Sequence, residues 1–203
     1  MDKFWKKRRG NRLFWGVLLF VVALLAYFLQ PIRMFETPYK VGEVTMFSML
    51  ILCLIGYFYG PLWGFLSGFL FGGVTYIADV LQGFSPFRFS EGLDYLLGYT
   101  VMGVCGLLAV IPRKDGTKRS LLFCYSCAVA LRFAESVWIW SFFREDPVSP
   151  LNDLWYGVIN CIGYLGIEYL LSLFLLLLPP TREVLSYIHR VATEKYTETY
   201  DFF

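Results

Sequence analysis

Six long apolar segments, separated by short polar connections, constrain the fold of this 203-residue chain. A helix needs ~20 mostly apolar residues to cross a bilayer, and lipid offers its backbone no hydrogen-bond partners. The chain is 57% apolar with a mean hydropathy of +0.55, which is too apolar for a soluble domain. We predict an all-α polytopic membrane protein, six transmembrane helices in a compact bundle, at about Leu13–Gln30, Val44–Tyr59, Pro61–Leu81, Leu93–Ile111, Ser120–Phe143 and Leu154–Leu178.

Basic residues mark one side of the predicted membrane domain. They precede the first span, separate the fourth from the fifth, and follow the sixth. The first group is Lys3, Lys6, Lys7, Arg8, Arg9 and Arg12, the second is Arg113, Lys114, Lys118 and Arg119, and the third is Arg182, Arg190 and Lys195. With six spans, these segments share one side, which the positive-inside rule assigns to the cytoplasm. We therefore predict a protein of the plasma membrane with both termini cytoplasmic. The outward connections are Pro31–Glu43, Gln82–Gly92 and Arg144–Asp153.

The predicted organisation has three parts: a basic cytoplasmic N-terminus (1–12), the membrane domain (13–178) and a cytoplasmic tail (179–203). The tail carries apolar residues at helical spacing, which favours a short amphipathic helix on the inner membrane surface. These residues are Val184, Leu185, Ile188 and Val191.

Glycines recur every four residues at Gly56, Gly60, Gly64, Gly68 and Gly72. The Gly60 position breaks the chain before a proline that begins the third span, where the missing N–H costs nothing. The later glycines form a smooth strip, and small residues let helices approach closely in lipid. The strip serves either packing within one bundle or docking of another membrane subunit.

Asp94 and Tyr95 begin the fourth span, and a carboxylate at membrane depth is costly unless its charge is offset. Under this topology, three other groups of polar or aromatic residues lie in the outward half of the membrane domain. They are Phe84, Phe87 and Phe89, then Trp138 and Trp140, and then Trp155, Tyr156 and Asn160. The alternative for the tryptophans is an interfacial aromatic belt. The alternative for Asn160 is a bridge between helices.

Four other charged residues also lie within spans. Arg132 and Glu135 are three residues apart, which permits an ion pair on one helix face. Otherwise Glu135 supplies a second carboxylate to a pocket. Asp79 is expected near the outer end of its helix, where water can reach it, and Glu168 lies deeper with no assigned partner.

A small outward-open pocket with an anion, an amide and aromatic rings suits a flat, cationic, water-soluble ligand, because ring faces attract cations. Cys124-x-x-Cys127 has metal-site spacing without a second pair, so buried packing is favoured over zinc. We therefore predict no metal and no cofactor. The basic N-terminus is interpreted as an orientation signal rather than a nucleic-acid arm.

Several stretches resemble the thiamine-specific substrate-binding (S) components of energy-coupling factor (ECF) transporters, the ThiT/YuaJ family. Gly42–Leu50 is similar to the start of the family's second helix, and Gly56–Gly64 to its break into the third. Leu93-Asp94-Tyr95 is similar to its acid-Tyr signature. Trp155-Tyr156 with Asn160 resembles its Tyr…Asn element on helix six.

The resemblance implies a six-helix subunit, without enzymatic activity, that captures thiamine from outside and works with a transmembrane coupling protein and two cytoplasmic ATPases. It implies that the acid at Asp94 pairs with the vitamin, and that Tyr95, Trp155 and Asn160 help to hold it. The complete predicted substrate site is Asp94, Tyr95, Asn160, Trp155, Tyr156, Trp138, Glu135, Ser136 and Phe84.

Two departures from the family pattern are visible. In span five, Ser136 fills a position where the family usually has His or Ser, but Trp140 stands where it has a glycine. In span one, the coupling pattern Ala-x-x-x-Ala is replaced by Ala23-x-x-Ala26. We nevertheless predict a partner-docking face at Ala23, Ala26, Gly64, Gly68 and Gly72.

Alternatives to thiamine uptake are an S component for a related water-soluble vitamin or precursor, and a membrane scaffold with no pocket. A membrane enzyme is disfavoured, because the sequence has no G-x-S-x-G run and no phosphate-binding loop.

Overall fold

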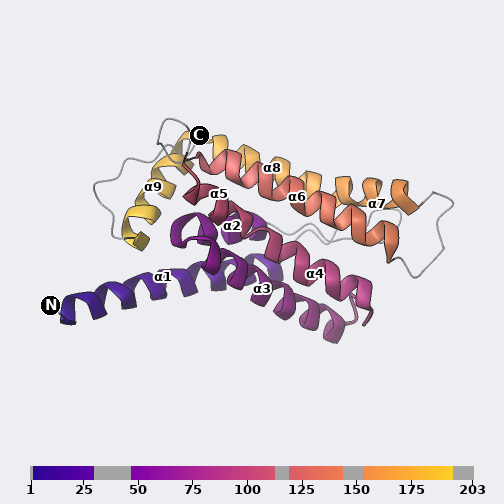
Figure 1. Ribbon diagram of the computed structural model, residues 1–203, viewed down its shortest axis with the longest axis horizontal. Coiled ribbons are helices and arrows are strands. Elements are labelled where there is room, and N and C mark those ends of the chain that lie inside the picture. The colour runs from indigo at the N-terminus through magenta and orange to yellow at the C-terminus, as the bar shows by residue number, and fades with distance from the viewer. Residues whose placement is uncertain (1, 30–46, 113–118, 144–152, 194–203) are drawn as a thin grey trace.

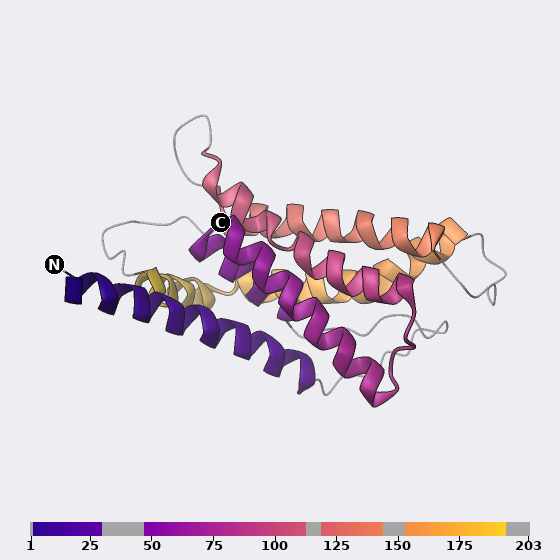
Figure 2. The ribbon, with the colours of Figure 1, turned by 60° about the horizontal axis from the view of Figure 1, so that its bottom comes forward.

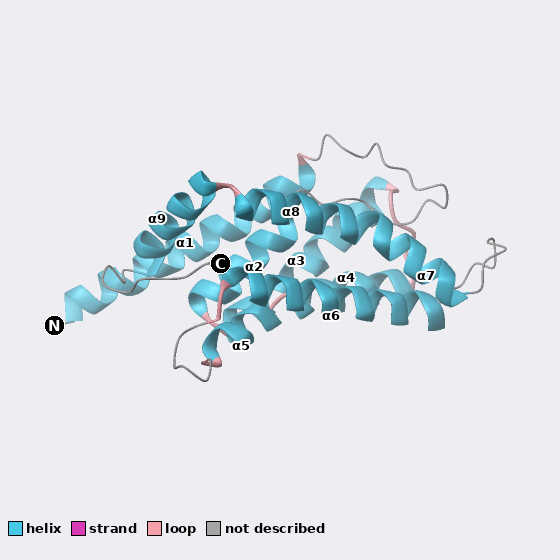
Figure 3. Ribbon diagram, turned by 90° about the horizontal axis from the view of Figure 1, so that it is seen from above, coloured by secondary structure: helices cyan, strands magenta, loops and turns pink. Residues whose placement is uncertain are grey.

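The computed structural model describes residues 2–29, 47–112, 119–143 and 153–193, in which the chain forms helices and turns but no strand (Figures 1 and 3). The all-α prediction is confirmed. The helices are α1 (Asp2–Phe28), α2 (Ser48–Tyr59), α3 (Pro61–Gln82), α4 (Phe89–Val101), α5 (Val104–Val110), α6 (Leu121–Phe142), α7 (Asp153–Cys161), α8 (Ile167–Leu177) and α9 (Pro179–Thr193), with a π-helical segment, Ile162–Gly166, between α7 and α8.

Four helical stretches among the described residues are long and apolar enough to cross a membrane: Pro61–Gln82, Phe89–Val110, Leu121–Phe142 and Gly157–Leu177. Two shorter apolar helices, Arg12–Phe28 and Ser48–Tyr59, accompany them. Together they coincide with the six predicted segments, although the two short ones do not reach the length of a full span. The long helices α1, α3 and α6 run roughly along the long axis of an elongated bundle, whereas α9 lies at a steep angle to it (Figures 1 and 2).

The fourth and sixth segments are less regular than predicted. The fourth begins at Phe89 rather than Leu93 and is interrupted after Val101. There the backbone tightens, because Gly103 N–H donates to the Thr100 carbonyl at 2.9 Å. The sixth segment is interrupted by the π-helical segment. Such local departures from α-helix are frequent at functional sites.

The glycine strip lies inside the bundle, where it packs α3 against its neighbours. A Cβ on Gly68 or Gly72 would overlap the Tyr99 or Tyr95 carbonyl of α4, and one on Gly64 would lie 2.9 Å from the Gly56 Cα of α2. The packing alternative is therefore the one observed, and these glycines are not available as an external docking face. The predicted break at Gly60 is present, since Gly60 has a φ of 98°, which favours glycine.

Helix α2 has only 12 residues, so it spans ~18 Å of a hydrocarbon core ~30 Å thick. A helix N-terminus at membrane depth exposes unpaired N–H groups. Glu168 of α8 meets this need, because its carboxylate accepts a hydrogen bond from Met49 N–H at 3.1 Å. Its negative charge also lies at the positive end of the α2 dipole. Glu168 thus has the partner that the sequence did not indicate.

Helix α9 packs on α1 and α2, with the bundle side formed by Leu185, His189 and Ala192, all buried. The His189 ring meets the Phe58 ring edge-on at 4.9 Å. The opposite side carries Val184 and Tyr187, which are exposed. The tail helix is amphipathic as predicted, but part of its apolar face covers the bundle instead of lipid.

Candidate functional site

A buried ion pair joins α4 to α6. The Arg132 guanidinium donates from Nη1 to Asp94 Oδ1 at 2.7 Å and from Nη2 to Asp94 Oδ2 at 3.0 Å. Both residues are buried. This two-pronged geometry is the strongest that an arginine makes with a carboxylate. The charge of Asp94 is therefore offset from within the chain, which the sequence analysis did not anticipate.

Three further side chains complete this cluster. The Ser136 hydroxyl donates to Asp94 Oδ1 at 2.6 Å and lies 2.9 Å from the Tyr164 hydroxyl of the π-helical segment. The Arg132 guanidinium also donates to Glu135. We call these five residues, Asp94, Arg132, Glu135, Ser136 and Tyr164, the ionic cluster.

The sequence of α6 explains how the cluster forms. Arg132, Glu135 and Ser136 are spaced i, i+3 and i+4, so they share one helix face. Across from them, Gly98 of α4 has no side chain, and a Cβ there would overlap the guanidinium. The guanidinium also lies 5.8 Å from the centre of the Tyr99 ring, within cation–π range.

The ionic cluster carries an imbalance of charge and of hydrogen bonds. Two carboxylates face one guanidinium, which leaves a net charge of −1 when all three are ionised. Glu135 Oε1 and Arg132 Nε are buried without a hydrogen-bond partner, and so is Trp140 Nε1 one turn beyond Ser136. Buried polar atoms are nearly always paired, so these unpaired atoms make the ionic cluster a candidate site for a polar ligand.

A second buried carboxylate, Asp79 of α3, lies in different surroundings. Its Oδ2 accepts hydrogen bonds from the Tyr27 hydroxyl of α1 and, at 2.7 Å, from the Tyr95 hydroxyl of α4. Its Oδ1 is buried without a partner. Asp79 is only 1% exposed, so the expectation that water reaches it is wrong.

The structure brings together some of the predicted site residues and not others. Ser136 is hydrogen-bonded to Asp94, and Glu135 is linked to both through Arg132. The Tyr95 hydroxyl instead binds Asp79. Phe84, Trp138 and Trp155 lie outside the ionic cluster and are 50%, 49% and 58% exposed. Trp138 instead contacts the rings of Phe142 and Phe143. The side chains of Tyr156 and Asn160 lie outside the described ones.

Four residues of the two polar regions were not predicted as site residues: Tyr27, Asp79, Arg132 and Tyr164. The Arg132 and Glu135 pair was visible as an i, i+3 spacing, but its link to Asp94 depends on how α4 and α6 face each other. Tyr164 lies one turn after Asn160, and that spacing was the available signal for it.

The alanines predicted for partner docking also lie against the bundle. Ala23 is fully buried, and its carbonyl accepts a hydrogen bond from the Ser48 hydroxyl at 3.2 Å. Ala26 is partly buried. Ala23 therefore belongs to the contact between α1 and α2 and is not available to a partner.

The fold and the ionic cluster define a class: a multi-pass α-helical membrane protein that gathers charged groups within its bundle. Residues 17–186 match the family model of the thiamine transporter protein (Thia_YuaJ). The chain belongs to this family, which confirms the resemblance found in the sequence. It is accordingly a thiamine transport protein embedded in the membrane, and its role is transport and not catalysis. A search among curated proteins finds no match.

Proposed function

We propose that this chain is the S component of an ECF-type uptake transporter, which binds thiamine in a pocket open to the outside of the plasma membrane. Both termini lie in the cytoplasm, where a coupling protein and two ATPases act on it. The basic residues of the N-terminus and of the connection after α5 support this orientation. The single observation that carries the ligand assignment is that two carboxylates share one guanidinium in the ionic cluster.

The charge count favours a monocation. Arg132 offsets one carboxylate, and the two-pronged contact assigns it to Asp94. The remaining carboxyl group is that of Glu135, whose Oε1 has no partner. Thiamine carries one permanent positive charge, so its binding makes the site neutral. In this chain Glu135 is therefore the residue that faces the ligand charge, and Asp94 holds the guanidinium and the adjoining polar groups in place.

The other predicted residues have supporting roles in this proposal. Ser136 and the indole N–H of Trp140 supply hydrogen bonds beside Glu135. The aromatic residues predicted from the sequence, Phe84, Trp138, Trp155 and Tyr156, are proposed as contacts for the rings of the vitamin, and Asn160 is proposed as a partner for its heterocycle. Tyr95 contributes its ring edge from α4.

Thiamine titration of the purified protein by calorimetry tests the assignment. Glu135→Gln removes the uncompensated charge while the Asp94–Arg132 contact stays, so we expect thiamine affinity to fall at least about fivefold, or ~1 kcal/mol. Asp94→Asn also neutralises the cluster and is expected to weaken binding by at least ~1 kcal/mol, with an additional loss of stability. Glu183→Gln, at an exposed site on α9, is the matched control and leaves affinity unchanged.

A ligand series sharpens the same test. Thiamine is expected to bind more tightly than its monophosphate, because the phosphate adds negative charge near a cluster that is already negative. A thermal-shift screen of water-soluble vitamins and thiamine precursors covers the alternative ligands. Undiminished thiamine affinity in both Glu135→Gln and Asp94→Asn would remove the charge-based assignment.

A further inference from the structure

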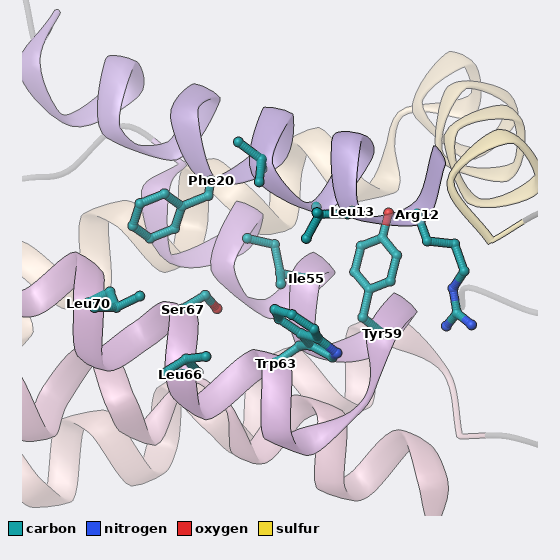
Figure 4. Close-up of a pocket in the computed structure, with 11 residues that line it drawn as sticks. Arg12, Leu13, Phe20, Ile55, Tyr59, Trp63, Leu66, Ser67 and Leu70 are labelled. Atoms are coloured by element: carbon teal, nitrogen blue, oxygen red, sulfur yellow. The ribbon is translucent and has the colours of Figure 1, made fainter. Parts of the chain in front are cut away.

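A groove between α1 and α3 has no role in the proposed thiamine site. Its volume is about 480 Å³. One wall is formed by α1 and the other by α3, with the end of α2 as its floor. It is lined by Arg12, Leu13, Gly16, Val17, Phe20, Ile55, Tyr59, Trp63, Leu66, Ser67 and Leu70 (Figure 4).

The polar groups of this groove are concentrated at one end. Figure 4 shows Arg12 beside Tyr59 at that end, with Phe20 and Leu70 at the other. The Ser67 hydroxyl is already bonded to the Gly64 carbonyl at 3.0 Å, so it does not call for a ligand. The groove is thus a lipophilic slot that ends at a cation.

Arg12 has no carboxylate partner among the residues that the structure describes. Its guanidinium lies 5.9 Å from the centre of the Tyr59 ring, and the Tyr59 hydroxyl is directed to the Ala192 carbonyl of α9 at 3.4 Å. An arginine held over a ring keeps its N–H donors free for an anion. Phosphate is the anion that the guanidinium fork fits best.

We propose that this groove binds an anionic phospholipid, with one acyl chain in the slot and the phosphate on Arg12. The length supports a chain, because Arg12 to Phe20 spans ~12 Å along α1.

A second groove provides an internal comparison. It lies between α2 and the α8–α9 junction, has a volume of about 390 Å³, and includes no charged residue in its lining. It is lined by Phe47, Leu50, Ile51, Leu54, Leu175, Leu176, Pro180, Thr181, Val184 and Leu185. Acyl chains can occupy it without a preference between headgroups. The selectivity that we propose therefore arises at Arg12.

Trp63 lines the groove and is half exposed, so it reports on the occupant. The full-length protein is reconstituted in phosphatidylcholine vesicles that contain increasing fractions of either brominated phosphatidylglycerol or brominated phosphatidylcholine. The part of the tryptophan quenching that Trp63→Phe removes belongs to the groove. We expect half-maximal quenching at a phosphatidylglycerol fraction about fivefold lower than that of phosphatidylcholine. This is the preference that the attraction between one arginine and an anionic lipid provides.

Two variants and one control test the geometry. Arg12→Gln is expected to abolish the preference for phosphatidylglycerol. Gly16→Leu is expected to reduce quenching by both lipids, because a Cβ at Gly16 already lies 3.7 Å from the Tyr59 ring and a larger side chain fills the slot. Arg119→Gln is the matched control, since Arg119 also lies over a ring, that of Phe123 at 5.3 Å, away from this groove, and it keeps the preference.

Other outcomes overturn the proposal. Equal quenching by the two lipids would show that the groove does not select an anionic headgroup. Equal loss of the preference in Arg12→Gln and Arg119→Gln would show only a general surface charge. Full competition by millimolar inorganic phosphate would make the site one for free anions. The groove would be assigned to a partner protein by two results together. Trp63 would show no lipid preference in the isolated protein, and it would be shielded from both lipids once the coupling protein and ATPases are bound. Thiamine titration of the same samples keeps this result separate from the proposed function.

Discussion

The two buried carboxylates of this bundle, Asp79 and Asp94, are stabilised in opposite ways. Asp94 faces a guanidinium and a hydroxyl, so its charge and both of its oxygens are satisfied. Asp79 receives only two phenol hydroxyls on one oxygen, and its other oxygen has no partner. Among the described residues, Asp79 has no cation beside it.

The difference separates the roles that a buried acid can have. An ion pair with good geometry fixes the positions of two helices, and removal of one partner leaves an uncompensated charge. A carboxylate held by hydroxyls alone orients those hydroxyls and can be replaced by an amide at lower cost. Asp94 therefore organises α4 against α6, whereas Asp79 links α1, α3 and α4 and holds the ring of Tyr95, beside Asp94.

The largest effect is expected from the loss of the guanidinium. Arg132→Met leaves Asp94 and Glu135 buried without a cation, and we expect it to destabilise the protein by ~3–5 kcal/mol. Chemical unfolding in detergent measures the change. The double variant Arg132→Met with Asp94→Asn removes one of the orphaned charges and is expected to recover part of the loss. A double variant as unstable as the single one would show that the charge balance is not what matters.

A smaller loss of stability is expected when a methyl group is added beside the ionic cluster. Gly98→Ala places a Cβ in the volume of the Arg132 guanidinium, which displaces the arginine and costs ~1–3 kcal/mol. The matched control is Gly73→Ala in α3, where the nearest atom to a Cβ is a Leu96 methyl at 3.7 Å. Helix propensity favours alanine by ~1 kcal/mol, so the control is expected to be neutral or stabilising. The melting temperatures of the two variants make the comparison.

Effects no larger than that of Gly98→Ala are expected at Asp79. Tyr27→Phe and Tyr95→Phe each remove one hydrogen bond to a carboxylate, and each is expected to cost ~1–3 kcal/mol of stability. Their effects on thiamine binding differ, because Tyr95 is in the proposed site and Tyr27 is not. In a double-mutant cycle, Asp79→Asn is expected to weaken thiamine binding in the parent chain but not in Tyr95→Phe. Additive losses would mean that Asp79 does not act through Tyr95.

Local features of the fold could be predicted from the sequence. Pro61 begins α3 as expected, and Ser120 caps α6 by accepting a hydrogen bond from Phe123 N–H at 3.3 Å. Length and hydropathy located the apolar segments, because each segment in lipid must form its backbone hydrogen bonds within itself. The interruptions after Val101 and at Ile162–Gly166 were missed, since both segments remain apolar throughout.

The site was only partly predictable, because its contacts join distant parts of the chain. Arg132 and Glu135 share a turn, so their pairing followed from spacing. Asp94 and Arg132 are 38 residues apart, and Tyr27 and Asp79 are 52 apart. Such pairs depend on the rotation of each helix about its axis. The close approach at Gly68 and Gly72 sets that rotation for α3 and α4, but a glycine strip does not say which neighbour it meets.

The contact between Glu168 and Met49 has a consequence for biogenesis. These residues are 119 positions apart, so a ribosome adding roughly 5–20 residues per second makes the carboxylate roughly 6–24 s after the amide that it receives. Until then the start of the second helix has no acceptor at that depth of the bilayer. We therefore expect the nascent second helix to acquire its final depth only when the last hydrophobic segment has left the translocon.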